Sequence, residues 1–151
     1  MIDPEYPESA PPEHRELREI ISRAVKAGGR TAVAAEAVRG VLYPHMRLEE
    51  AFAAPPLSLL PKLAAGEVTP DMEKIIQISA MMKIQLPRML DQHRLIVTAL
   101  KELMRAATDE QHPAYVQFAQ KMMQHAQHEE EVLYPAAIVI GEYVKLKLGK
   151  T

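Results

Sequence analysis

The sequence predicts an all-α fold, an up-down-up-down bundle of four helices. Apolar residues recur at spacings of three and four along four segments, as on the buried face of a helix. Three connections join these segments, which is the number that a four-helix bundle needs. Composition also favours helix, because alanine, leucine, methionine and glutamate are common and only 6 glycines occur. A chain of 151 residues is long enough for one domain with a substantial core.

The first predicted helix follows an irregular arm over residues 1–10, which contains three acidic residues and two prolines. A single domain is expected over 11–148. The proline pair 11–12 would lie in the first helical turn, where proline lacks only an unneeded donor. The glycine pair 28–29 would end this helix, since glycine readily adopts the left-handed conformation of a helix C-cap.

The second predicted helix begins near Thr31 and ends at the proline pair 55–56, with Pro44 expected to kink it. Residues 55–68 then form a long connection that is apolar rather than polar. Connections of this length are usually functional or packed against the core. The sequence therefore predicts that the leucines of this connection cover one end of the core: Leu57, Leu59, Leu60 and Leu63.

The third predicted helix starts at Thr69-Pro70-Asp71, a favourable N-terminal sequence, and runs to about Ala107 with a kink at Pro87. After a turn over 108–112, Pro113 opens the fourth helix, which continues to about Lys147 with a bend at Pro135. The stripe expected to face the core in this helix consists of Phe118, Met122, His125, Glu129, Val132, Ala136 and Val139.

The third and fourth predicted helices are long enough to project beyond the first two at one end of the bundle. Their projecting parts, residues 72–84 and 136–146, are rich in isoleucine, valine, alanine and methionine. Exposed apolar surface of this kind marks contact sites. A homodimer formed through this overhang is therefore expected.

Two copies of the pattern H-x-x-x-E-E-x-x-x-x-P stand out, over residues 45–55 and 125–135. Residues four apart lie one turn apart on the same face of a helix, so each copy directs an imidazole and a carboxylate to one side. His14 and His93 occupy core-facing positions on the other two helices. Buried ionisable groups are costly unless they are paired or bind a metal.

The spacing predicts that these groups meet. His14 and His45 lie at nearly equal distances from the turn at 28–29, as His93 and His125 do from the turn at 108–112. We expect a site for two metal ions in which each hairpin contributes its own pair of histidines. Imidazole and carboxylate donors with open positions suit non-haem iron, with manganese or zinc as substitutes. The predicted metal ligands are His14, His45, Glu49, His93, His125 and Glu129.

Other interpretations were weighed for the polar residues of these helices. The histidines could be separate hydrogen-bonded core residues, and the glutamates could be solvated partners of lysine or arginine. Glu50, Glu130 and Glu131 are expected to face solvent or to support the ligands. His128 is expected at the surface or in support of the ligands, and His112 in a turn. Packing or a supporting hydrogen bond is expected for Tyr43 and Tyr134.

This pattern resembles the hemerythrin-like, or HHE cation-binding, family over about residues 10–140. The family pattern places a histidine on the first helix, H-x-x-x-E on the second, a histidine on the third and H-x-x-x-E on the fourth. The resemblance implies a bundle that holds two irons, bridged by the two glutamates and an oxo or hydroxo group. On this chain the matching residues are His14, His45 and Glu49, His93, and His125 and Glu129.

Two positions depart from oxygen-carrying members of that family. Those proteins usually have a second histidine one turn before the third-helix ligand, where this chain has Met89. They also have an aspartate five residues after the last histidine, whereas here Glu129 follows His125 by four. The ligand set instead resembles that of bacterial di-iron proteins of nitrosative stress and iron–sulfur repair.

The expected function is binding or sensing of O2, NO or a related reduced-oxygen ligand, or iron handling in a stress response. A di-iron oxidase or peroxide-consuming enzyme is the first alternative, and a metal-stabilised interaction module is the second. A net charge of -2 with mixed signs argues against nucleic-acid or membrane partners. The absence of cysteine excludes a thiolate site. With no apolar run of membrane length and no basic leader, a cytoplasmic location is expected.

Overall fold

A computed structural model describes residues 12–150 of the chain. The irregular arm expected over 1–10, and Pro11, lie outside the described residues. Within the described range every regular element is helical. No helix in this range is both long enough and apolar enough to cross a membrane.

The first hairpin consists of α1 (Pro12–Val25) and α2 (Gly29–Leu48). Gly28 and Gly29 between them have φ angles of 79° and 63°. Side chains other than glycine rarely adopt this left-handed region, so the glycine pair explains the sharp reversal. The first helix ends at Val25, before the glycines, and Gly28 is the N-cap of α2. The glycines form the predicted turn, but the prediction that they cap the first helix is wrong.

The second helix does not stop at the proline pair 55–56, contrary to the prediction. A π-helical turn, η1 (Glu49–Ala53), leads directly into α3 (Ala54–Ser58), which carries proline at its first positions. Proline is tolerated there because the first turn of a helix has no use for its N–H. A further short helix, α4 (Leu60–Ala64), follows. The expected long connection is therefore largely helical.

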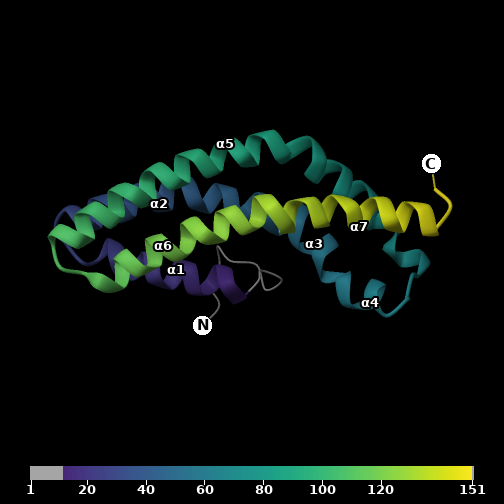
Figure 1. The fold of residues 1–151 in the computed structure, drawn as a ribbon, viewed down its shortest axis with the longest axis horizontal. Coiled ribbons are helices and arrows are strands. Elements are labelled where there is room, and N and C mark those ends of the chain that lie inside the picture. Colours follow the sequence, from purple (N-terminus) through teal and green to yellow (C-terminus); the bar gives the residue numbers. More distant parts are fainter. Residues whose placement is uncertain (1–11, 151) are drawn as a thin grey trace.

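The second hairpin is longer than the first (Figure 1). A 3₁₀ turn, η2 (Pro70–Met72), precedes α5 (Glu73–Asp109). The second arm of this helical hairpin comprises α6 (Pro113–His128), a second π-helical turn η3 (Glu129–Leu133), and α7 (Tyr134–Lys147). Pro87 lies inside α5 without ending it. Figure 1 shows α5 as a bowed helix, with α6 and α7 forming one nearly continuous line beside it.

The helices pack as a bundle around three groups of buried apolar side chains. The largest lies between α1, α2, α5 and α6, where Ile21, Leu42 and Leu100 are almost completely buried. A second group surrounds Tyr134. The third joins α4 to the ends of α5 and α7 through Leu63. Of the leucines expected to cover the core, Leu57, Leu59 and Leu63 do so, but Leu60 is exposed.

The turns of the two hairpins contact each other at the end of the bundle shown on the left of Figure 1. Glu110 accepts hydrogen bonds from the backbone N–H of Arg30, the backbone N–H of Thr31 and the Thr31 hydroxyl, at 3.1, 2.7 and 2.6 Å. These bonds satisfy N–H groups in the first turn of α2 that have no partner within the helix. They therefore hold the two hairpins at a common height.

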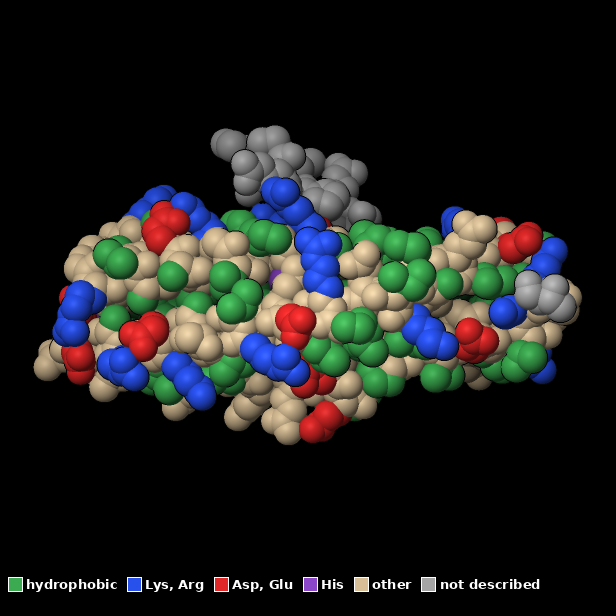
Figure 2. Space-filling model, turned by 90° about the horizontal axis from the view of Figure 1, so that it is seen from above, with side chains coloured by type: hydrophobic (Ala, Val, Ile, Leu, Met, Phe, Trp, Pro, Cys, Tyr) green, Lys and Arg blue, Asp and Glu red, His purple; other side chains and the backbone are tan. Residues whose placement is uncertain are grey.

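The surface carries charges of both signs. The face seen in Figure 2 shows Lys and Arg interspersed with Asp and Glu, and apolar side chains between them. Such interspersed charges provide no single-sign field of the kind that attracts a polyanion.

Candidate metal centre

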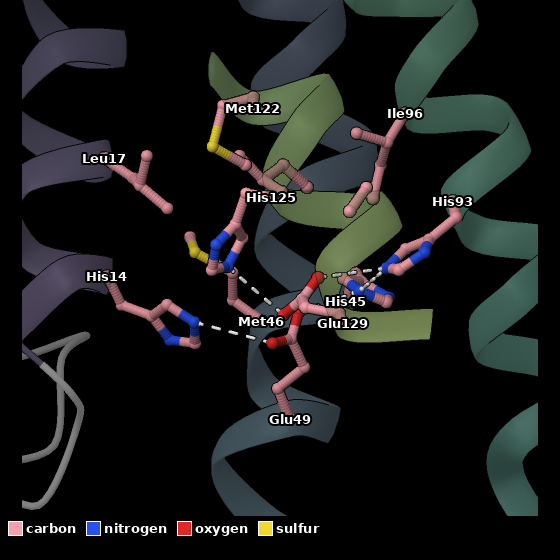
Figure 3. A pocket seen from close by; sticks show the side chains of 12 residues that line it. His14, Leu17, His45, Met46, Glu49, His93, Ile96, Met122, His125 and Glu129 are labelled. Carbon is pink, nitrogen blue, oxygen red and sulfur yellow. Dashed lines mark hydrogen bonds and ion pairs between the residues drawn. The ribbon is translucent and has the colours of Figure 1, made fainter. Parts of the chain in front are cut away.

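All six residues predicted as metal ligands line one cavity in the middle of the bundle (Figure 3). The cavity has a volume of about 10 Å³, which is roughly the space of one water-sized sphere. Leu17, Met46, Ile96 and Met122 form much of its apolar wall. Five of the six polar residues are buried, and the sixth, His125, keeps 27% of its side chain exposed.

One half of the centre is formed by His45 and His93. Their Nε2 atoms lie 2.9 Å apart. His45 Nε2 lies 2.8 Å from Glu49 Oε1, and His93 Nε2 lies 3.2 Å from Glu129 Oε1. One ligand atom from each of these four residues falls within 4.8 Å of the others. This buried group could hold a metal ion.

The other half is formed by His14 and His125 and is more open. His14 Nε2 lies 3.8 Å from Glu49 Oε2, and His125 Nε2 lies 3.3 Å from Glu129 Oε2. Each motif meets the histidine of its hairpin partner, as expected, because His14 faces Glu49 and His93 faces Glu129. His45 on α2 meets His93 on α5, and His14 on α1 shares the second half with His125 on α6, so both halves combine the two hairpins.

The two glutamates lie between the halves. In each carboxylate Oε1 faces the His45/His93 half and Oε2 faces the His14/His125 half. Carboxylates that present one oxygen to each of two histidine pairs have the arrangement required to bridge two cations. Glu49 and Glu129 are 8% and 4% exposed, so solvent does little to stabilise their charges.

Outer hydrogen bonds orient three of the histidines. The Nδ1 atoms of His14, His45 and His93 face Glu50, Gln92 and Glu130 oxygens at 3.0, 2.7 and 2.8 Å. These oxygens accept hydrogen bonds from Nδ1–H, and an imidazole that is neutral then directs an Nε2 lone pair inward. Support of this kind for the outer nitrogen is typical of histidines that bind metals.

With both imidazoles neutral, lone pairs outnumber protons at the His45/His93 half. Two Nε2 atoms and two carboxylate oxygens converge there, and the Tyr134 hydroxyl supplies one proton, 2.9 Å from His45 Nε2 and 3.1 Å from His93 Nε2. Acceptors that face one another without donors repel. A bound cation removes this repulsion, because it accepts a lone pair from each of them.

The ionisable groups of the centre shift one another's pKa values. Burial alone would raise the pKa of Glu49, but hydrogen bonds with Glu129, His14 and His45 lower it well below its ordinary value. Burial and the neighbouring Glu49 raise the pKa of Glu129. Two adjacent buried carboxylates repel each other, so ionisation of one disfavours ionisation of the other.

The histidines respond to the same carboxylates. Burial opposes protonation of His14 and His93, but hydrogen bonds with Glu49 and Glu50 raise the pKa of His14, and bonds with Glu129 and Glu130 raise that of His93. The hydrogen bond with Glu129 raises the pKa of His125. The carboxylates therefore favour positive charge at this site, where protons and a cation would compete for the same lone pairs.

A π-helical turn begins at the glutamate of each motif, four residues after the histidine, and sets the direction of the residues that follow. The N–H groups of Ala54 and Tyr134 bond to the carbonyls of Glu49 and Glu129, five residues back instead of four. Pro55 and Pro135 follow at once, and proline removes the next N–H and crowds the carbonyl four residues earlier. A wider turn relieves this crowding, and such turns often occur at functional sites.

The extra residue in the second π turn changes which side chains are buried. A constant helical period predicted Val132 and Val139 on the core face, but they are 48% and 63% exposed. Tyr134 and Ile140 are buried instead. This shift of the buried face places the Tyr134 hydroxyl beside the metal centre, as the hydrogen-bonding interpretation of this tyrosine allowed.

Some of the remaining polar residues form hydrogen bonds with the histidines of the centre, and others lie at the surface. Glu50 and Glu130 support histidines, while Glu131 bonds to Gln127 at the surface. His128 is exposed, and Tyr43 packs beside the core. The role of Gln92 as the partner of His45 was not predicted. The feature of the sequence that could have indicated this role is the position of Gln92 directly before His93.

Comparison with known proteins identifies no relative of this chain, because no family model, no curated protein and no solved structure matches it. The functional argument therefore rests on the geometry of the centre.

Proposed function

We propose that the chain is a hemerythrin-like, up-down-up-down bundle that binds two non-haem iron ions and, through them, a small ligand such as O2 or NO. The observation that carries this proposal is the opposed orientation of the carboxylate oxygens of Glu49 and Glu129. Each glutamate faces both histidine pairs, so the protein offers two sets of nitrogen and oxygen donors linked by two bridges.

The donor chemistry fits iron. Imidazole and carboxylate donors with remaining open positions are typical of non-haem iron sites, whereas structural zinc is usually enclosed by four ligands. Manganese or zinc could occupy the same donors. Bound iron would supply a change of oxidation state and a position at which a small ligand coordinates, along with an oxo or hydroxo bridge.

The protein residues would divide this work. His45 and His93 would hold one cation and His14 and His125 the other, with Glu49 and Glu129 between them. Gln92, Glu50 and Glu130 would keep the imidazoles in the tautomer that directs Nε2 inward. The apolar wall would exclude bulk water and strengthen the attraction between the carboxylates and the cations.

A groove between α1 and α6 offers a route for a small ligand. It has a volume of about 470 Å³ and is lined by residues of both helices, including Glu13, Glu16, Phe118 and Lys121. Leu17, Met122 and His125 line both this groove and the buried cavity. A ligand that enters here would reach the His14/His125 half first.

Metal analysis of protein produced in iron-replete cells, followed by an optical spectrum, tests the proposal. About two irons per chain with bands typical of an oxo-bridged pair would support it. Protein that contains no iron and whose stability is unchanged in His45→Ala and His125→Ala would contradict it. Stoichiometric binding of a small ligand, without turnover, would separate binding or sensing from the di-iron oxidase alternative.

We also propose that the exposed apolar side chains of α5 and α7 join two copies of this chain. Ile84, Val139 and Leu146 are 68%, 63% and 79% exposed, and they lie within the two segments expected to form an interface. Burial of such side chains stabilises association by roughly 25 cal/mol for each Å² of apolar surface removed from water. Sedimentation at micromolar concentration should detect a dimer, and Val139→Glu should weaken it. A wild-type monomer would contradict this interface.

A further inference from the structure

The Tyr134 hydroxyl occupies an unusual position beside the candidate centre. Tyr134 is 1% exposed, and its hydroxyl oxygen lies 2.9 Å from His45 Nε2 and 3.1 Å from His93 Nε2. The two Nε2 atoms are themselves 2.9 Å apart. The three atoms therefore form a nearly equilateral triangle, and all three can donate a lone pair.

This triangle has the size of one face of a metal coordination sphere. When metal–ligand bonds are about 2.1 Å long, adjacent donors of an octahedron lie roughly 3.0 Å apart. The three measured distances agree with that spacing. Glu49 Oε1 and Glu129 Oε1 lie 2.8 and 3.2 Å from the two Nε2 atoms and continue the same pattern.

We propose that Tyr134 is a fifth protein ligand of the cation held by His45 and His93, and that it binds through its phenolate oxygen. This inference rests on the metal-binding function proposed above. As the phenol binds, its O–H bond breaks, the proton leaves to solvent, and the oxygen lone pair forms the new bond to the cation. The cation stabilises the resulting oxyanion, and tyrosine is an established ligand of iron in proteins.

The sequence makes this ligand possible on one side of the centre only. In the repeated motif, Tyr134 stands directly before Pro135, and the matching residue before Pro55 is Ala54. Both follow a π turn of the same length. Other residues at corresponding positions of the two motifs have corresponding partners. Glu50 accepts a hydrogen bond from His14, and Glu130 accepts one from His93. Ala54 has no donor atom for the His14/His125 half.

The two cations are therefore unequal. The cation at His45 and His93 has one anionic oxygen donor more than the other, and this donor favours the ferric over the ferrous state of iron. The cation at His14 and His125 retains the open position, which lies beside the groove between α1 and α6. The exogenous ligand is expected to bind to this second cation.

The test compares ferric-loaded wild type with Tyr134→Phe, which keeps the buried ring, and with the control Tyr143→Phe on the same helix. Wild type and the control should show a phenolate-to-iron absorption band and tyrosinate vibrations in the resonance Raman spectrum. Tyr134→Phe should lose both signals completely while it retains two irons per chain.

A second measurement does not depend on the folding of a variant. Wild type that contains ring-deuterated tyrosine should show shifted tyrosinate vibrations. Two bound irons without any phenolate signal in wild type, or with an unchanged signal in Tyr134→Phe, would overturn the assignment and leave the proposed function intact. Wild type that binds no iron would overturn the proposed function itself.

Discussion

The two halves of the candidate metal centre come from the same repeated motif but are not alike. At the His45/His93 half the Nε2 atoms are 2.9 Å apart, both side chains are buried, and a tyrosine hydroxyl is adjacent. At the His14/His125 half the distances to the carboxylates are 3.8 and 3.3 Å, and His125 borders an open groove. A repeated motif can thus contribute to an asymmetric site.

This difference indicates that the two halves have different roles. A half with closely spaced donors is suited to holding a cation, because little reorganisation is needed when the cation binds. A half with fewer donors and access to solvent is suited to exchange of a ligand. The following predictions test that difference in roles, in order of decreasing effect.

Loss of a bridging carboxylate should affect both halves. Glu129→Gln replaces a charged bridge that faces His93 and His125 with a neutral amide. We expect both cations to bind more weakly, by more than the roughly 100-fold that loss of an outer hydrogen-bond partner costs. Metal analysis after gel filtration measures the result, with Glu131→Gln at the surface as the control. Two irons retained in Glu129→Gln would contradict the bridging role.

Replacement of one histidine at a time should separate the halves. His125→Ala should remove the cation near the groove and leave one iron with its phenolate absorption. His93→Ala should remove that absorption, because His93 belongs to the half that contains Tyr134. Iron content and the visible spectrum distinguish the two variants. Identical spectra in both would mean that the halves are not independent.

Loss of an outer partner should have a smaller effect. Gln92→Leu removes the oxygen that fixes the tautomer of His45. Such changes typically weaken metal binding by about 10- to 100-fold. Competition with a chelator measures the affinity, and Gln117→Leu in the outer groove is a suitable control. An unchanged affinity in Gln92→Leu would show that this hydrogen bond does not orient the ligand.

The pH dependence should differ between metal-free and metal-loaded protein. Hydrogen bonds with the carboxylates raise the pKa values of His14, His93 and His125 above 6.5 despite burial. Their contribution to the stability of the metal-free protein is therefore fully present below pH 6.5 and is lost as the pH rises through the raised values. Metal binding competes with protons and strengthens over the same range. Thermal unfolding on both sides of pH 6.5 should show a metal-induced stabilisation that increases with pH. A constant difference would contradict competition between protons and metal at these histidines.

The smallest effect is expected far from the centre, at Glu110. Its carboxylate accepts hydrogen bonds from the Thr31 hydroxyl, the Thr31 N–H and the Arg30 N–H, which lower its pKa to about 2. Glu110→Ala should lower the midpoint of chemical unfolding slightly without changing the iron content. In wild type the contribution of the Glu110 hydrogen bonds to stability should be complete above pH 4.5 and should decline as the pH falls towards about 2. Loss of iron in Glu110→Ala would mean that the turns control the metal centre directly.

Much of this arrangement was predictable from residue spacing. The two glycines at the first turn, Pro113 at the second, and the equal distances of the histidines from these turns brought all six candidate ligands to one cavity. Such predictions succeed because helical rise and the reversal at glycine depend on local sequence alone.

The pairing of the histidines and the position of Tyr134 were not predictable in the same way. A constant helical period cannot include the extra residue of a π turn, so Val132 and Val139 were placed on the wrong face. The repeated proline after each glutamate was the available signal for that turn. The pairing of His45 with His93 depends on which helices are neighbours across the bundle, which helical periodicity within each segment does not determine.

The most direct test of two unlike iron positions is the Mössbauer spectrum of protein loaded with iron-57. Two unlike positions predict two quadrupole doublets of equal area in the diferric wild type. Tyr134→Phe should alter one doublet and leave the other unchanged. A single doublet from two equivalent irons, or a spectrum that accounts for only one iron per chain, would contradict the account.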